Sequence, residues 1–270
     1  EAQELARSAA ERCSVCGLRV SGRPKLLELV ERCRCGSEEN ALVARFLRDE
    51  SAVAPLLRRG FHALNDDERL RKKLSQSLAV LEELERLVPD LGAWHIVDLC
   101  CGKSLTCALA ALRHPGVVVT GIDRLARRHL PHFAEEGLRS VRYARLDVLA
   151  EDFLETLGHA VSAEGRPVAL LGMHLCGRLS ERAAEAFHRL PLARACVLSP
   201  CCLPPLEEAP PALAPLYRSK STDGEQYAAW GDHLAGLLRS RGGAAVVRSE
   251  NPEMLSIKRT LLAATRPPSE

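Results

Sequence analysis

Three acidic residues each stand at the end of a short apolar run, where their carboxylates are able to bind a ligand. Asp98 closes the first run, Asp123 the second and Asp147 the third. A carboxylate after the second run can accept hydrogen bonds from both hydroxyls of a ribose, and one beside the third run can accept from an adenine amino group. Aspartate is also a common turn residue, so coincidence is the alternative. The three together favour a nucleoside site.

The turn after Asp98 supports close approach of a ligand to the backbone. It contains one glycine, Gly102, which lies between Cys100 and Ser104. Glycine permits close approach because no Cβ atom intrudes. Ser104 has a second interpretation, as the N-cap of a helix that begins next. A dinucleotide site is the weaker alternative, because a pyrophosphate needs a more open glycine turn at a helix N-terminus.

The elements that must position these residues alternate between two periodicities. The sequence predicts strands at 95–100, 117–123, 141–147, 167–174 and 195–200, separated by helices near 105–113, 125–137, 151–160 and 178–189. Such alternation is typical of right-handed βαβ units and a parallel sheet. Ligands of open α/β sheets bind beyond the carboxyl ends of the strands. The three carboxylates are therefore expected at one edge of the sheet.

The C-terminal part of the sequence predicts a loop, a helix and a strand pair. Residues 204–215 are rich in proline and are expected to form a surface loop. A helix is expected near 224–241. Residues 244–250 and 260–266 are then expected to form two strands, joined by a reversal at Asn251-Pro252-Glu253.

The N-terminal part is expected to be helical. Leucines recur at helical spacing between residues 70 and 87, with charged residues between them. A Pro-Asp-Leu-Gly sequence then ends the pattern. We expect residues 1–90 to form a helical N-terminal extension and residues 91–270 to form the main domain.

Composition limits the classes of protein and partner. The net charge is +2 and apolar residues make up 46% of the chain, which suits a globular protein without a strongly basic nucleic-acid surface. No apolar run approaches the length of a membrane span, and no secretory signal pattern opens the sequence. The eleven cysteines are an odd number and fall mostly in apolar runs or pairs. We therefore expect a reducing compartment, the cytoplasm or alternatively the nucleus.

Two close cysteine pairs near the N-terminus are a candidate metal site. Cys13 and Cys16 form the first pair, and Cys33 and Cys35 form the second. Four thiolates are able to hold one structural zinc ion, with the glycine after each pair easing the turn. The alternative is that these thiols simply lie on helices, exposed or partly buried.

A second group of reactive residue types follows the fourth and fifth predicted strands. His174 and Cys176 lie in Gly-Met-His-Leu-Cys-Gly, and Cys201 and Cys202 end Ser-Pro-Cys-Cys. The topology places these four near a bound substrate. His174 is able to act as a general base, the four together are able to bind zinc, and they are also able to line a pocket without reacting. Inert packing at the strand ends is a further alternative.

Two basic clusters are candidates for phosphate contacts, and solvated helix faces are the alternative explanation. One cluster follows the second predicted strand and comprises Arg124, Arg127, Arg128, His129, His132, Arg139, Arg142 and Arg145. The other lies at the start of the leucine-rich helix and comprises Arg69, Arg71, Lys72 and Lys73.

The strand-end pattern resembles class I S-adenosylmethionine-dependent methyltransferases over roughly residues 94–266. Their usual turn reads acidic-x-Gly-x-Gly-x-Gly, and Cys100 and Ser104 stand at its first and third glycines. The resemblance implies an α/β, Rossmann-like class I methyltransferase sheet, mostly parallel with an antiparallel last strand. It implies S-adenosylmethionine as cofactor, with zinc as a further candidate. The cofactor residues it implies are Asp98, Cys100, Gly102, Ser104, Asp123 and Asp147.

The motifs around His174 narrow the resemblance. His-Leu-Cys-Gly followed by Cys-Cys is similar to the tRNA 2′-O-methyltransferases of the acceptor stem. It is also similar to the methyltransferase-like domain behind a glutathione S-transferase C-terminal domain, with which Ser256-Ile257-Lys258 agrees. The resemblance implies a tRNA-like RNA acceptor, with His174, Cys176, Cys201 and Cys202 on the acceptor side. A protein or small-molecule acceptor, and a non-catalytic binding module, are the alternatives.

Overall fold

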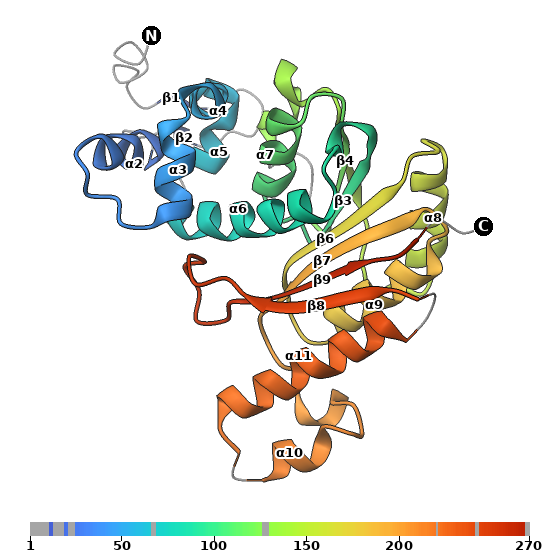
Figure 1. The fold of residues 1–270 in the computed structure, drawn as a ribbon. Helices are drawn as coiled ribbons and strands as arrows, with labels where there is room; N and C mark the ends of the chain where they lie inside the picture. Colours follow the sequence, from blue (N-terminus) through green and yellow to red (C-terminus); the bar gives the residue numbers. More distant parts are fainter. Residues whose placement is uncertain are drawn as a thin grey trace.

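A seven-stranded sheet dominates the computed structural model, which describes residues 11–12, 19–20, 25–65, 69–125, 130–219, 221–240 and 243–267. The strand order is β5-β4-β3-β6-β7-β9-β8, and β9 runs antiparallel to both of its neighbours (Figure 1). The strands are β3 His95–Leu99, β4 Val118–Asp123, β5 Val141–Arg145, β6 Val168–Leu175, β7 Ala193–Pro200, β8 Ala245–Glu250 and β9 Thr260–Thr265. The predicted mostly parallel sheet with an antiparallel last strand is confirmed.

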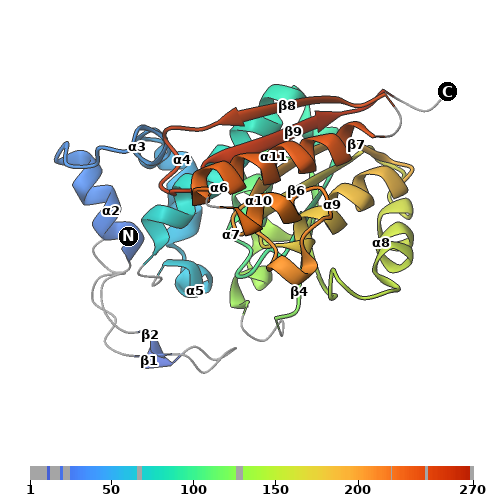
Figure 2. The ribbon, with the colours of Figure 1, turned by 90° about the horizontal axis from the view of Figure 1, so that it is seen from below.

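Helices cover both faces of the sheet, and each face has its own core (Figure 2). On β3, Ile96 belongs to one core, whereas Val97 and Leu99 belong to the other. Strands buried on both faces have continuous apolar sequences, which is why the strands were recognisable as short apolar runs. The first face carries α2 Lys25–Arg34, α3 Ala41–Arg48, α6 Leu70–Leu87 and α7 Leu105–Arg113; the second carries α8 Phe153–Ser162, α9 Arg178–Arg189 and α11 Asp223–Arg239.

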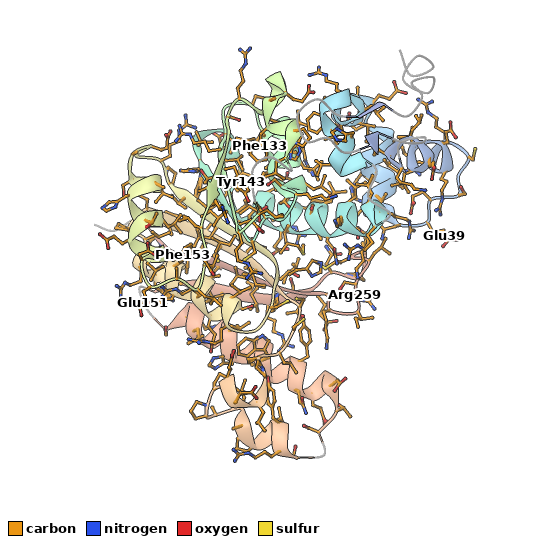
Figure 3. The ribbon with its side chains drawn as sticks, turned by 180° about the vertical axis from the view of Figure 1, so that it is seen from behind. Glu39, Phe133, Tyr143, Glu151, Phe153 and Arg259 are labelled. Carbon is orange, nitrogen blue, oxygen red and sulfur yellow. The ribbon has the colours of Figure 1, made fainter. Side chains whose placement is uncertain are left out.

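The predicted helix at 125–137 is wrong in the part of it that the structure describes. Only two short 3₁₀ turns occur there, η5 Pro131–Ala134 and η6 Glu136–Leu138. Pro131 lacks a backbone donor, and Gly137 has a low helix propensity, so a regular helix is disfavoured in this stretch. Phe133 from η5 packs edge-on against Tyr143 of β5, with ring centroids 5.7 Å apart (Figure 3).

The remaining described elements are short, and most lie in connections. None of the described helices combines the length and the apolar character needed to cross a membrane. These elements are β1 Glu11–Arg12, β2 Arg19–Val20, α4 Glu50–Val53, η1 Ala54–Leu57, η2 Arg59–Phe61, α5 His62–Asn65, η3 Leu91–Ala93, η7 Leu206–Glu208 and α10 Ala214–Arg218.

The connection between β8 and β9 ties the C-terminal strands to the N-terminal helices. Asn40 Nδ2, just before α3, donates to the backbone oxygen of Glu253 at 2.6 Å. The backbone amide of Leu255 donates to Ser75 Oγ of α6 at 3.0 Å. The second bond ties α6 to the connection between β8 and β9, and α6 forms one wall of the cavity described below.

Candidate functional site

The turn after β3 keeps a glycine-like backbone although two of its positions carry side chains. Cys100, Gly102 and Ser104 have φ values of 58°, 55° and 61°. Non-glycine residues adopt this left-handed region at a cost of roughly 1–2 kcal/mol each. The turn therefore has the backbone course expected of a glycine-rich loop, with one thiol and one hydroxyl added to it.

Ser104 occupies the N-cap position of α7 but does not cap it. Its Oγ donates to Cys101 Sγ at 3.1 Å, and it makes no side-chain hydrogen bond to the helix. The interpretation of Ser104 as a capping side chain is therefore wrong. Its left-handed backbone explains the failure, because a capping residue normally has β-region angles that aim its oxygen at the first-turn amides.

Gly121 of β4 is a residue of this site that sequence reasoning missed. A Cβ placed there lies 2.9 Å from Cys101 Sγ, 3.0 Å from Cys107 Sγ and 3.3 Å from Ser104 Oγ. The turn can approach β4 closely only because this position has no side chain. A glycine inside an apolar strand was the signal that should have identified it.

We expect Gly121→Ala to destabilise the protein by about 1–3 kcal/mol, because the added methyl group overpacks the sulfurs behind the turn. Urea unfolding measures the loss. Gly236→Ala is the matched control, because no atom lies within 4 Å of a Cβ there and Gly236 lies inside α11. That control should gain stability from helix propensity. Equal stability of wild type and Gly121→Ala would contradict the close packing of turn and strand.

Asp123 and Asp147 line the same cavity, here named the β5 cavity, which has a volume of about 500 Å³ and is also lined by Cys100, Leu146, Cys176 and Gly177. Asp123 Oδ2 accepts from the Gly102 amide at 2.8 Å, and its Oδ1 accepts from the Leu125 amide at 3.0 Å. Asp147 Oδ1 accepts from the Leu149 amide at 2.9 Å. The two predicted ligand carboxylates are thus together, and Asp123 also joins β4 to the glycine of the turn.

Asp98 lies apart from those two carboxylates, in a second cavity. It is 2% exposed and accepts a hydrogen bond from Cys107 Sγ at 3.4 Å. Burial raises the pKa of Asp98 to about 7. Near neutral pH this side chain is therefore poised between a neutral acid and a buried anion.

Asp98→Asn is expected to stabilise the protein at pH 8 by on the order of 1–4 kcal/mol and to change stability little at pH 4. A carboxyl whose pKa is raised by folding binds more protons in the folded state, so its ionisation lowers stability between about pH 4 and pH 7. The difference between the unfolding free energies of the two proteins, measured with urea at each pH, isolates Asp98. Groups that titrate alike in both proteins cancel in this difference. A difference that is independent of pH would show that Asp98 is not the titrating group.

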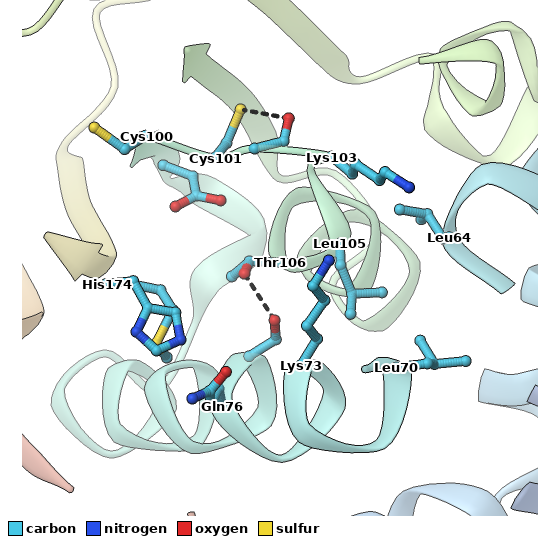
Figure 4. A pocket seen from close by; sticks show the side chains of 14 residues that line it. Leu64, Leu70, Lys73, Gln76, Cys100, Cys101, Lys103, Leu105, Thr106 and His174 are labelled. Carbon is cyan, nitrogen blue, oxygen red and sulfur yellow. Dashed lines mark hydrogen bonds between the residues drawn. The ribbon is translucent and has the colours of Figure 1, made fainter. Parts of the chain in front are cut away.

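The second cavity, here named the α6 cavity, has a volume of about 200 Å³ and lies between α6, the turn and the end of β6 (Figure 4). Gln76 is 2% exposed, and its Nε2 has no hydrogen-bond partner among the described residues. Ser77 Oγ lies 2.9 Å from Thr106 Oγ1. The residues that line the α6 cavity include Lys73, Gln76, Ser77, Asp98, Cys100, Gly102, Lys103, Thr106 and His174. Cys100 lines both cavities, so they adjoin at the turn.

Gln76, Ser77 and Thr106 were not identified from the sequence. The available signal was the polar triplet Ser75-Gln76-Ser77, which interrupts the leucine pattern between Leu74 and Leu78. Polar side chains buried within an apolar helix need partners. In Figure 4 Gln76 and Lys73 extend from α6 into the cavity that His174 also lines.

A break in the register of β6 separates His174 from the cysteines. The pairing with β7 shifts between Met173 and Leu175, and His174 has a φ of 59°. Such bulges re-aim side chains at strand ends. The ring lines the α6 cavity, where desolvation and the charges of Lys72 and Lys73 lower the pKa of His174. His174 is therefore neutral at pH 7.

The three predicted acceptor-side cysteines lie together without His174. Cys176 Sγ lies 2.8 Å from Cys201 Sγ and 3.4 Å from Cys202 Sγ, and the last two sulfurs are also 3.4 Å apart. In the described part of the chain, these are the only three side chains of metal-binding type grouped within 4.8 Å. A four-ligand set including His174 is not formed, because the imidazole points into the α6 cavity.

The N-terminal cysteine pairs are only partly within the described residues. Cys13 and Cys16 lie outside them. Cys33 is buried in α2 and its Sγ donates to the Ala44 oxygen at 3.6 Å, whereas Cys35 is exposed after the helix. The four-thiolate zinc site stays a prediction.

Several residues of the two predicted basic clusters have structural partners. Arg71 pairs with the fully buried carboxylate of Glu38 at 2.6 Å. His132 is buried and its ring stacks with Phe61, with centroids 5.9 Å apart. Arg142 pairs with Glu164. Lys73 and Lys103 line the α6 cavity and Arg124 lines the β5 cavity, whereas Arg127, Arg128 and His129 lie outside the described residues.

The sheet order and the turn at the end of β3 define a Rossmann-like α/β domain. The chain belongs to the methyltransferase domain family, whose model matches residues 72–209. The match begins within α6 and ends after β7, so it includes the cysteine cluster, the residues of the β5 cavity and, apart from Leu64 and Leu70, those of the α6 cavity.

Individual relatives are more distant. Trans-aconitate 2-methyltransferase of Paracidovorax citrulli (strain AAC00-1) is 40% identical over 68 residues, which are 25% of this chain and 25% of that protein. The match therefore spans about a quarter of the curated relative. A fibrillarin/Nop5p complex structure has 10% identity and a TM-score of 0.44, covering 65% of this chain and 73% of that one. An O-methyltransferase family protein of Burkholderia thailandensis has 17% identity and a TM-score of 0.36, covering 75% and 61%.

Proposed function

We propose that this protein transfers a methyl group from S-adenosylmethionine to an acceptor. The observation that carries the proposal is the pair of adjoining cavities that share Cys100 at the turn after β3. The β5 cavity has carboxylates to receive an adenosine, and the α6 cavity has polar groups to receive the methionine part. Family membership over residues 72–209 supports the same reaction.

The residues present fit this cofactor. We assign Asp123 to the ribose hydroxyls and Asp147 to the adenine amino group, and their common position in the β5 cavity supports this assignment. Gln76 Nε2 is a buried donor without a partner among the described residues, and it suits a carboxylate of the methionine part. A Cβ at Gly102 would meet no atom within 4 Å, so the backbone there borders open space.

S-adenosylmethionine supplies an electrophilic methyl group, which an acceptor attacks in line. The protein's own contribution is to align the acceptor and to accept its proton. We assign the second task to His174, because its lowered pKa leaves it neutral and able to bind a proton at pH 7. We also assign Cys176, Cys201 and Cys202 to the acceptor side, although they lie apart from His174 beyond the register shift in β6.

For the acceptor we propose RNA. Lys72, Lys73 and Lys103 lie at or beside the α6 cavity, so this cavity has positive charges that the phosphates of an RNA can contact. The alternative is a small acid, which the same charges would attract; the curated relative acts on trans-aconitate by its name. The thiols around the cavities suit a reducing compartment, so we place the protein in the cytoplasm or nucleus.

Calorimetric titration with S-adenosylmethionine and S-adenosylhomocysteine tests the proposal. Binding of both at micromolar concentration supports it, whereas no binding at millimolar concentration would favour a non-catalytic module. Labelled methyl transfer is then measured on total RNA, total protein and small carboxylic acids. Label in RNA that is sensitive to ribonuclease supports the proposed acceptor, and label confined to protein or acids contradicts it.

A further inference from the structure

The strand ends of β6 and β7 bring three thiols into mutual contact. Cys176 follows β6, and Cys201 and Cys202 follow β7, which is its parallel neighbour in the sheet. Leu175 pairs with Pro200, so the residues just beyond both strands begin at the same level. The Gly177 amide donates to the Cys202 oxygen at 3.1 Å and joins the two turns. Gly177 itself has φ 52° and ψ −130°, a conformation essentially restricted to glycine.

These thiols are poorly suited to act as nucleophiles. The base predicted beside them, His174, is turned into the α6 cavity by the register shift in β6. Thiols are weak hydrogen-bond donors and acceptors, so contacts among three of them add little stability. A disulfide would pair only two of the three and would need an oxidant that nothing in the site supplies. A metal cation that prefers sulfur ligands is able to bind all three cysteine sulfurs at once.

We propose that Cys176, Cys201 and Cys202 form a three-thiolate site for one zinc ion, with its fourth position open to solvent. On binding, each thiol releases its proton to water and a sulfur–zinc bond forms. Cys176 also lines the β5 cavity, so the open position lies beside the proposed cofactor site. Three protein ligands with an exchangeable fourth position are typical of zinc sites that bind a further ligand.

The measured geometry suits this ion after a small adjustment. Zinc–sulfur bonds of about 2.3 Å in a tetrahedral arrangement place the sulfurs about 3.8 Å apart. The observed separations are 2.8, 3.4 and 3.4 Å, so the cluster must open by about 1 Å or less. Cys176 and Cys202 are exposed and Cys201 is partly exposed, which leaves room for this movement and for entry of the ion.

Zinc affinity of the full chain, measured by competition with a chromophoric chelator under a non-chelating reductant, tests the proposal. The experiment uses the double variant Cys16→Ser/Cys35→Ser as the parent, because it removes one ligand from each cysteine pair and leaves only two of the four ligands of the predicted N-terminal site. We expect the parent to bind one zinc ion, and Cys201→Ser added to it to weaken that binding at least 100-fold. Cys196→Ala is the matched control; it removes a nearby buried thiol of β7 that does not belong to the cluster.

Cobalt(II) provides a second readout that does not depend on methyl transfer. Thiolate-to-cobalt charge-transfer bands should be present in the parent and in the Cys196→Ala control, and should weaken in Cys201→Ser and in Cys202→Ser. Unchanged zinc affinity in both serine variants would overturn the proposal. A parent that binds no zinc, or whose Cys176 and Cys201 are found as a disulfide under the same conditions, would also overturn it. Binding of S-adenosylhomocysteine is measured separately, so failure of the proposed methyl-transfer function is distinguished from failure of the zinc proposal.

Discussion

Replacing His174 by glutamine is expected to lower kcat for methyl transfer by about 10²- to 10⁴-fold, the usual contribution of a positioned general base. Glutamine keeps hydrogen-bonding capacity at the wall of the α6 cavity but cannot accept a proton. The dissociation constant of S-adenosylmethionine should change by less than about threefold, because proton transfer is not part of binding. Single-turnover rates on the acceptor and calorimetry with the cofactor measure the two effects. If cofactor binding is lost together with kcat, His174 contributes to cofactor binding and not to proton transfer.

The pH dependence of the rate provides an independent check on His174. Its pKa is lowered by desolvation first and then by the charges of Lys72 and Lys73, so the rate should fall only below the usual histidine range. Lys72→Gln removes one positive charge, which raises the pKa and moves the acid limb to higher pH by roughly 0.2–0.5 unit at low salt. Lys25→Gln on α2 is the matched control and should leave the profile unchanged. An acid limb that does not move in Lys72→Gln would exclude His174 as the titrating base.

The parallel part of the fold was predictable because its physical cause is local. Strands such as β3 and β6 are buried on both faces over most of their length, so their sequences are mostly apolar. The helix predicted at 125–137 is wrong in the described part of that stretch, because amphipathic spacing alone does not make a helix. In the described part, Pro131 and Gly137 outweigh the pattern, and Phe133 is held by packing against Tyr143.

The site was predictable only where it follows from topology. Asp123 and Asp147 meet because parallel strands end at one edge, and Cys176 meets Cys201 for the same reason. His174 departs from this group because the register shift in β6 turns its ring into the α6 cavity, which no spacing rule reveals. Gln76 lines the cavity because α6 packs on the sheet. That packing joins elements from different parts of the sequence, so the spacing of residues within α6 does not predict it.

Replacing Asp123 by alanine is expected to weaken S-adenosylmethionine binding roughly 10- to 100-fold, because a hydrogen-bonded charged group contributes about 1.5–3 kcal/mol. The same carboxylate accepts from the Gly102 amide at 2.8 Å, so the substitution also loosens the turn. The two effects are separable by titration with 5′-methylthioadenosine, which keeps the ribose but lacks the amino-acid part. If Asp123 binds the ribose, both ligands should lose affinity equally. A loosened turn would weaken S-adenosylmethionine binding more.

Asp152→Ala is the matched control for Asp123→Ala, because Asp152 is an exposed aspartate just before α8 and makes no side-chain capping bond to that helix. It should bind S-adenosylmethionine like wild type. Asp123→Asn should lie between wild type and alanine, since its amide keeps one oxygen to accept either the Gly102 amide or a ribose hydroxyl. Equal affinity of wild type and Asp123→Ala would show that the end of β4 does not hold the ribose, and the adenosine would then have to be placed outside the β5 cavity.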